Sequence, residues 1–144
     1  MKKVISVTVA AVILLLSLAG CSGSEFDFDK TAELLEANGF MAATSYDTEY
    51  ELKQMTYKFN EMVYEQGGAF RVEIERYVSF LNDNDHSVSC TLVEFTEEEQ
   101  AKQFIELYLF AREGYSEMKI ARSGKIIVYT DSTEAQKNLK LEFR

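Results

Sequence analysis

The chain has 144 residues, 47% apolar residues, no proline and a formal net charge of −9. Its length fits one globular domain, and its apolar content is enough for a packed core. An acidic surface repels phosphate backbones, which argues against nucleic-acid binding and against lying on anionic lipid through basic residues. We attribute the acidity to solubility.

The first twenty residues have the organisation of an export signal. Lys2 and Lys3 precede an apolar run, and small residues follow it. A transmembrane helix is the alternative interpretation of this run. The run at 4–19 has 16 residues, fewer than the ~20 that a spanning helix needs. The export signal is therefore favoured.

The sequence Leu-Ala-Gly-Cys at 18–21 resembles the lipobox of bacterial lipoproteins. The resemblance covers the leader alone. It implies a cut between Gly20 and Cys21, a thioether-linked diacylglycerol on Cys21, and an acylated mature N-terminus. Two acyl chains would anchor the protein stably, at ~0.8 kcal/mol per buried methylene. The implied location is the extracytoplasmic face of the cell membrane; Ser22 implies the outer membrane if the host has two membranes.

Three parts are therefore predicted: a cleaved signal at 1–20, a lipid-anchored tether at 21–29 and one domain at 30–144. Loss of the two leader lysines changes the net charge from −9 to −11. Residues 22–29 reach ~28 Å even when fully extended. We expect the domain to stay close to the bilayer.

The domain is predicted to begin with a helix over 30–38, followed by a weak strand candidate at 41–46. Asp29 or Thr31 can cap the helix, and an Asn-Gly pair ends it. The strand candidate is short and contains small and β-branched residues.

A second helix is predicted over 48–66, because its apolar residues recur at steps of three and four. Thr48 is a plausible cap. Tyr50, Tyr57 and Tyr64 recur every seven residues, nearly opposite the apolar stripe. They either lie at the margin of a helix between the sheet and the first helix, or form a lane that faces a partner.

A hairpin is predicted next, with a polar turn at 82–85 and a return strand that begins at Val88. The apolar residues at even positions from Phe70 to Phe80 predict one core-facing side. The residues of opposite parity are also apolar: Val93, Phe95, Ile127 and Tyr129. We therefore expect that something covers the second face of the sheet.

The helix predicted over 96–112 is apolar around more than half of its circumference. One sheet face cannot cover so much surface. Either other helices flank it, or Leu107 and Phe110 meet another chain. Strands at 118–122 and 126–130, joined by a Ser-Gly turn, and a final helix to about residue 141 complete the domain.

The predicted fold class is α+β, an antiparallel sheet of four or five strands with helices mainly on one face. The order from 41 to 122 is that of a ferredoxin-like βαββαβ unit, extended by an N-terminal helix and a C-terminal βα unit. Without the strand at 41–46, a four-stranded meander is the alternative.

No catalytic motif, metal site or cofactor is predicted. His86 lies in a polar turn, where a solvated histidine is usual. Once Cys21 is acylated, Cys90 is the one remaining thiol, so no internal disulfide is expected. The alternating pattern around Cys90 favours a buried thiol.

The favoured function is a membrane-anchored, non-catalytic interaction module that binds a protein partner or forms a homodimer. The candidate interface comprises Tyr50, Tyr57, Tyr64, Leu107 and Phe110. A small-ligand binder with a tyrosine-lined pocket between the helices and the sheet is the alternative. A carboxylate-based hydrolase is the least favoured, because capping and exposed strand faces account for the acidic residues.

Overall fold

The computed structural model describes residues 26–46, 48–82, 84, 89–111 and 118–144. The predicted signal peptide with Gly20, the predicted lipidation residue Cys21 and His86 of the predicted turn lie outside these ranges. The described elements follow in chain order: α2 (Phe28–Ala37), β1 (Phe40–Tyr46), α3 (Glu49–Glu65), β2 (Ile74–Asn82), β3 (Ser89–Phe95), α4 (Glu98–Ala111), β4 (Lys119–Ser123), β5 (Ile126–Thr130) and α5 (Thr133–Leu139).

The fold is α+β, as predicted, with a five-stranded sheet in the order β1-β2-β3-β5-β4. Every neighbouring pair of strands is antiparallel. The strand candidate at 41–46 is confirmed as β1. The β4–β5 turn comprises Gly124 and Lys125, one residue later than expected, and Gly124 has the positive φ of +56° that such a turn favours.

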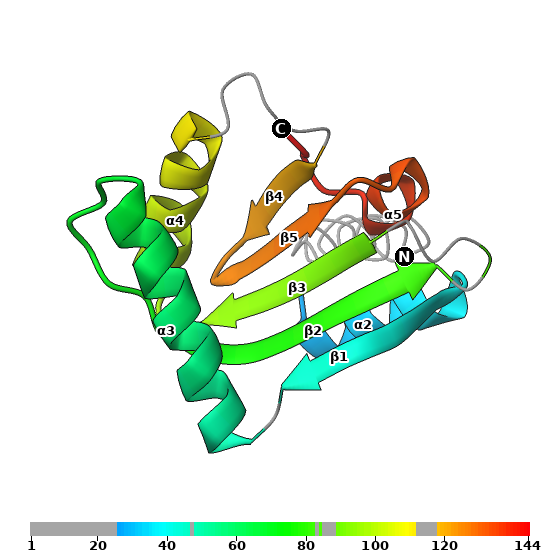
Figure 1. Ribbon diagram of the computed structural model, residues 1–144. Coiled ribbons are helices and arrows are strands. Elements are labelled where there is room, and N and C mark those ends of the chain that lie inside the picture. Colours follow the sequence, from blue (N-terminus) through cyan, green and yellow to red (C-terminus); the bar gives the residue numbers. More distant parts are fainter. Residues whose placement is uncertain (1–25, 47, 83, 85–88, 112–117) are drawn as a thin grey trace, which may run out of the picture.

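Helices cover both faces of the sheet, so the expectation of helices mainly on one face is wrong. Figure 1 shows α3 in front of the strands and α2 behind them. Val93 and Ile127 belong to the cluster packed by α3 and α4, whereas Leu92 and Val128 belong to the cluster packed by α2 and α5. Because side chains alternate along a strand, β3 and β5 are apolar on both sides. The expected cover over the second face is confirmed.

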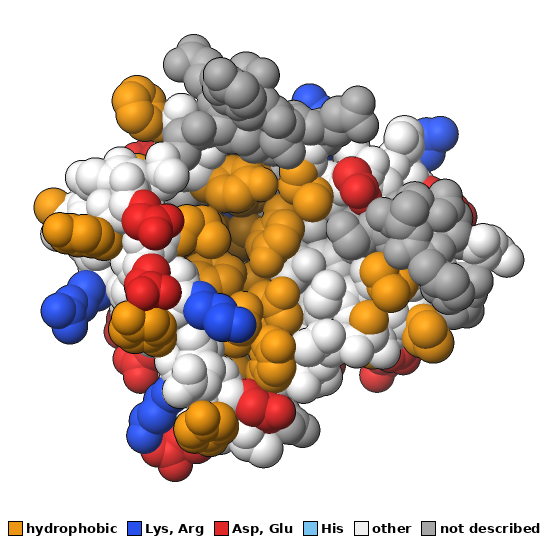
Figure 2. Space-filling view, viewed as in Figure 1, with side chains coloured by type: hydrophobic (Ala, Val, Ile, Leu, Met, Phe, Trp, Pro, Cys, Tyr) orange, Lys and Arg blue, Asp and Glu red, His pale blue; other side chains and the backbone are white. Residues whose placement is uncertain are grey.

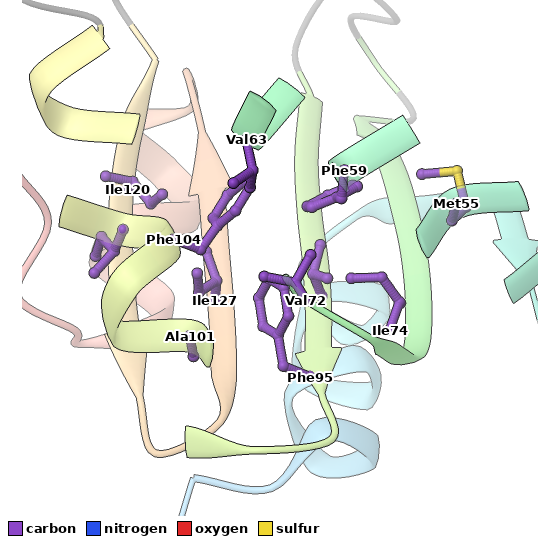
Figure 3. Close-up of a cluster of buried hydrophobic side chains, with 12 residues drawn as sticks. Met55, Phe59, Val63, Val72, Ile74, Phe95, Ala101, Phe104, Ile120 and Ile127 are labelled. Atoms are coloured by element: carbon purple, nitrogen blue, oxygen red, sulfur yellow. The ribbon is translucent and has the colours of Figure 1, made fainter. Parts of the chain in front are cut away.

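Aromatic side chains form the centre of the α3–α4 core (Figure 3). The Phe104 ring stacks on Phe59 with centroids 5.0 Å apart and lies 5.5 Å from the Phe95 ring. Aromatic pairs at such distances add to the stability that burial alone provides. This core holds α3 and α4 rigidly on the sheet, with the outer face of α3 left free.

The ferredoxin-like order is wrong, because β1 pairs directly with β2. A split βαβ unit would place another strand between the two strands that flank the helix. The four-stranded meander is wrong as well, because β5 lies between β3 and β4. The chain after α3 returns along the helix, where Asn60 bonds to Val72 and Thr56 bonds to Ile74, before it enters β2 beside β1.

A bulge in β2 overturns the expected shared parity from Phe70 to Phe80. The register with β3 shifts between Ile74 and Arg76. The extra residue moves the later side chains to the other face. Ile74 therefore packs under α3 and α4, whereas Val78 and Phe80 pack under α2 and α5.

Candidate interaction surface

Three exposed tyrosines lie along the outer side of α3. Tyr50 is 72% exposed, Tyr57 61% and Tyr64 82%, whereas Met55, Phe59 and Val63 on the inner side of the same helix are buried. Steps of seven residues place the tyrosines about 10 Å apart along the helix. We call this stripe of Tyr50, Tyr57 and Tyr64 the tyrosine lane.

The tyrosine lane is not covered by α2, since α2 packs on the opposite face of the sheet. The expected arrangement of α3 between the sheet and the first helix is therefore wrong. Figure 2 shows separate apolar side chains among charged ones at the α3 side of the molecule. The lane is a free surface with respect to the described residues.

Local interactions fix the start of α3. Thr48 is its N-cap, as predicted, and forms a capping box with Glu51. The Glu51 backbone N–H donates to the Thr48 hydroxyl, and the Glu51 carboxylate accepts from the Thr48 backbone N–H. Both bonds satisfy amides that have no partner within the helix.

The segment after α3 is attached to the helix by two side chains. The Asn60 amide donates to the Val72 carbonyl at 2.8 Å, and its oxygen accepts from the Val72 N–H at 2.9 Å. The Thr56 hydroxyl accepts from the Ile74 N–H at 3.0 Å. A Cβ on Gly68 would lie 2.6 Å from Val63 Cγ1, so the returning chain approaches the helix as closely as only glycine allows.

This attached segment and the tyrosine lane enclose an open pocket of about 750 Å³. Its walls combine aromatic and charged side chains: Lys53, Tyr57, Glu61 and Tyr64 from α3, with Phe70 and Arg71 from the returning chain. Lys53 bonds to Glu49 at 2.6 Å. A hydrogen bond to the Glu61 carboxylate raises the pKa of Tyr57 above its usual value. Arg71 has no ion pair with another described residue.

The two candidate interface residues on α4 have different surroundings. Phe110 is 75% exposed. Leu107 is half-buried and packs against the α3–α4 core beside Gly68. Phe110 is therefore an exposed aromatic residue on α4, whereas Leu107 belongs mainly to the packing of the domain.

A second group of tyrosines, from β1, β2, β5 and α4, packs against the α3–α4 core, and sequence reasoning missed it as a group. Tyr46 and Tyr77 have ring centroids 5.2 Å apart, and Tyr108 and Tyr129 have centroids 6.4 Å apart. Burial raises the pKa of Tyr129 well above its usual value, and its hydroxyl bonds to Tyr77 and Thr91. Figure 2 shows a hollow with an apolar floor between α3 and the sheet. In the sequence, the one sign of this group was the position of Tyr129, whose side chain lies on the opposite side of its strand from the presumed core residues.

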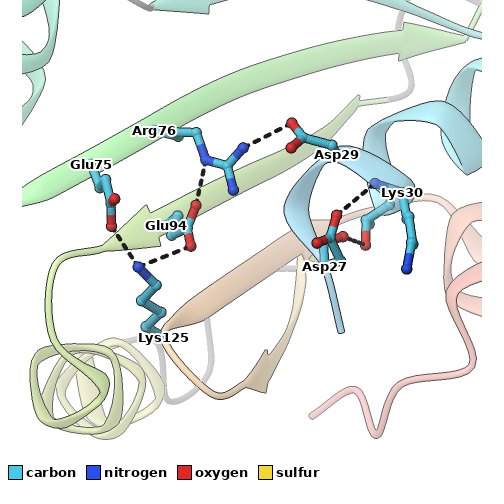
Figure 4. Close-up of polar contacts among 8 residues, drawn as sticks. Asp27, Asp29, Lys30, Glu75, Arg76, Glu94 and Lys125 are labelled. Atoms are coloured by element: carbon cyan, nitrogen blue, oxygen red, sulfur yellow. Dashed lines mark hydrogen bonds and ion pairs between the residues drawn. The ribbon is translucent and has the colours of Figure 1, made fainter. Parts of the chain in front are cut away.

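Glu94 is the buried carboxylate of the described residues, with its side chain 7% exposed. Figure 4 shows it between two cations, Arg76 on one oxygen and Lys125 on the other at 3.2 Å. Arg76 also bonds to Asp29 at 2.8 Å, and Lys125 bonds to Glu75 at 2.6 Å. Both oxygens of Glu94 thus accept from cations. We infer a structural role, because these contacts connect α2, β2, β3 and the β4–β5 turn.

Cys90 is fully buried, as predicted, and burial raises the pKa of its thiol to about 12. Within the described ranges, no three His, Cys, Asp or Glu side chains are grouped so that they could hold a metal ion. No helix in the described part of the chain combines the length and the apolar character that crossing a membrane requires. Comparisons with known proteins gave no match: no family model, no curated protein and no solved structure is similar to this chain.

Proposed function

We propose that the protein is a lipid-anchored, non-catalytic module that associates with a second copy of itself through the tyrosine lane. The observation that carries the proposal is the exposure of Tyr50, Tyr57 and Tyr64 on a helix whose other side is fully packed. Tyrosine suits interfaces because its ring is apolar and its hydroxyl can remain hydrated.

The order of residues along the lane supports a second copy as the partner. If two α3 helices pair antiparallel about Tyr57, Tyr57 meets its own counterpart and Tyr50 meets Tyr64 of the other copy. The same symmetry brings Lys53 to Glu61 of the other copy. A two-fold interface requires such self-complementarity. A single two-fold rotation therefore brings together aromatic side chains and opposite charges of the two copies.

The contact area fits a membrane-bound association. Three tyrosines at these exposures contribute roughly 300–500 Å², against ~800 Å² per partner in a standard interface. Lys53, Glu61 and Arg71, which line the pocket beside the lane, provide further area. Anchors in one membrane raise the effective concentration of two copies, so a modest interface is sufficient.

Cysteine cross-linking of the membrane-bound chain tests the arrangement. We expect Tyr57→Cys to form a symmetric disulfide dimer under mild oxidation, because residue 57 lies on the two-fold axis. Tyr50→Cys should cross-link to Tyr64→Cys and poorly to itself. Acylated Cys21 and buried Cys90 leave no competing thiol. Equal cross-linking of all combinations, or none, would contradict the antiparallel pairing.

Charge exchange provides an independent test. Lys53→Glu should place two carboxylates opposite each other and reduce dimer formation. The double variant Lys53→Glu, Glu61→Lys restores opposite charges and should recover it. Lys58→Glu, an exposed change elsewhere on α3, serves as the matched control. A double variant no better than Lys53→Glu would refute the pairing.

The tyrosines at Tyr46, Tyr77, Tyr108 and Tyr129 support a second candidate function, the binding of a small ligand between α3 and the sheet. Ring faces and hydroxyl groups together suit a flat ligand that carries polar groups. A thermal shift that is present in the wild type and lost in Tyr129→Phe would support it. A metabolite library that produces no shift would contradict it.

A further inference from the structure

A second surface feature lies between α2 and α5, on the face of the sheet opposite the tyrosine lane (Figure 1). It is an open pocket of about 630 Å³. Three lysines line it, Lys30 from α2 with Lys137 and Lys140 from α5 and its end. Their ammonium groups form no ion pair with another described residue. Such a cluster is unexpected in a chain with a net charge of −9.

The other residues of this pocket favour an anionic ligand with an apolar part. Asp27 is the one acidic residue among the described residues that line it, and its carboxylate already accepts from the Lys30 backbone N–H at 3.0 Å. The Asn138 amide nitrogen is buried and has no hydrogen-bond partner among the described residues. Leu34, 41% exposed, adds apolar surface. Three cations match phosphate oxygens, and the unpaired Asn138 amide lies in the wall of the same pocket.

The position of the pocket identifies the source of the phosphate. Phe26, the first described residue, forms part of the pocket wall. Five residue steps separate it from Cys21, and they span at most ~18 Å. If Cys21 carries the lipid, the pocket cannot leave the bilayer surface by more than this distance. Phospholipid headgroups are then the phosphate groups nearest to it.

We propose that the α2–α5 pocket binds the phosphate-bearing headgroups of anionic phospholipids in the membrane that holds the anchor. The inference rests on the lipid anchor of the proposed function. Docking of this face turns α2 and α5 toward the bilayer and leaves the tyrosine lane on the far side of the sheet, free to pair. The three lysines of the pocket, rather than the net charge of the chain, determine which face binds the lipid. Each lysine should raise the affinity for an anionic surface about fivefold.

The test uses the full lipidated chain in nanodiscs, with Leu34→Cys carrying a nitroxide label. In phosphatidylglycerol discs, we expect a several-fold loss of collisions between the label and a water-soluble nickel chelate. Phosphatidylcholine discs should leave the label accessible. A label at Glu106→Cys on α4 is the reference that stays accessible in both. An exposed Leu34 label in phosphatidylglycerol discs would overturn the proposal.

Charge reversal identifies the groups responsible. Lys137→Glu with Lys140→Glu should restore the accessibility of the Leu34 label in phosphatidylglycerol discs. Lys58→Glu with Lys102→Glu, an equal charge change on α3 and α4, should not. If both pairs of substitutions restore the accessibility of the label equally, net charge rather than this pocket is responsible, and the proposal is overturned. Protection of the label by inorganic phosphate on phosphatidylcholine discs would indicate a site for free phosphate instead, which also overturns it.

A thiol count separates this inference from the proposed anchor. Cys90 is buried, so a wild-type chain with lipidated Cys21 should take up no thiol label without denaturant. Uptake of one label per chain would refute the anchor. No uptake, combined with an accessible Leu34 label in phosphatidylglycerol discs, would refute the headgroup site alone.

Discussion

Replacement of Asn60 by alanine should destabilise the domain by about 2–4 kcal/mol. Asn60 bonds to both backbone groups of Val72, at 2.8 Å and 2.9 Å, and Val72 is 3% exposed. Removal of the amide leaves an N–H and a carbonyl unpaired, and both groups are partly buried. A fully buried group left unpaired costs about 1–3 kcal/mol, so we expect about 1–2 kcal/mol for each of these. The pocket beside the tyrosine lane should loosen as well, because this contact holds its far wall.

Urea unfolding followed by circular dichroism measures the effect. For a domain of this size, with a slope of about 1–3 kcal/mol per molar urea, the midpoint should fall by roughly 1–2 M while the slope stays constant. Gln54→Ala, a change at an exposed position of the same helix, is the control and should leave the midpoint nearly unchanged. Equal midpoints for Asn60→Ala and wild type would refute this account of the segment after α3.

Three further predictions concern single residues. Gly68→Ala should lower stability by about 1–3 kcal/mol in the same urea assay, because its Cβ would meet Val63 Cγ1 at 2.6 Å; an unchanged midpoint would contradict the close approach. Cys90 should not react with a thiol reagent at pH 8 until urea unfolds the chain, because its pKa is about 12; rapid reaction of the native protein would refute its burial. The backbone N–H of Lys30 lowers the pKa of Asp27 below 3.8, so the stability from this cap is complete above pH 3.8 and is lost as the pH falls through the native pKa. In Asp27→Asn, the free energy of unfolding should fall less with decreasing pH than in the wild type. Parallel plots of unfolding free energy against pH for the two proteins would contradict this expectation.

The secondary structure followed from local sequence rules, because its signals are local. Thr48 with Glu51 is a complete helix start within four residues, and the seven-residue spacing of the tyrosine lane sets its side of α3. The cap of α2 is Asp27, whereas Asp29 or Thr31 was expected. The sequence alone could not select among them, because these acidic and hydroxyl residues lie within about one turn of each other.

The topology did not follow, because single contacts between distant residues decide it. The bulge after Ile74 reverses the parity of β2 without any glycine or proline to mark it. Asn60, which bonds to the chain between α3 and β2, is one polar residue among many on α3. Without these two features, the pattern of elements fits a ferredoxin-like order equally well.

The candidate sites divide in the same way. The tyrosine lane is periodic within one helix, so its position opposite the apolar stripe was predicted, while its exposure was one of two alternatives. The tyrosine pair of Tyr46 and Tyr77 depends on the β1–β2 register. The α2–α5 pocket joins Lys30 to Lys137 across more than a hundred residues of sequence. Neither could be assembled before the fold was known.

Native mass spectrometry of the chain, extracted from cells in mild detergent, tests the central claim most directly, because one spectrum reports both the proposed anchor and the proposed partner. The account predicts a dimer in which each chain begins at Cys21 and carries the mass of the lipid. A monomer, an intact leader or an unmodified Cys21 would contradict it.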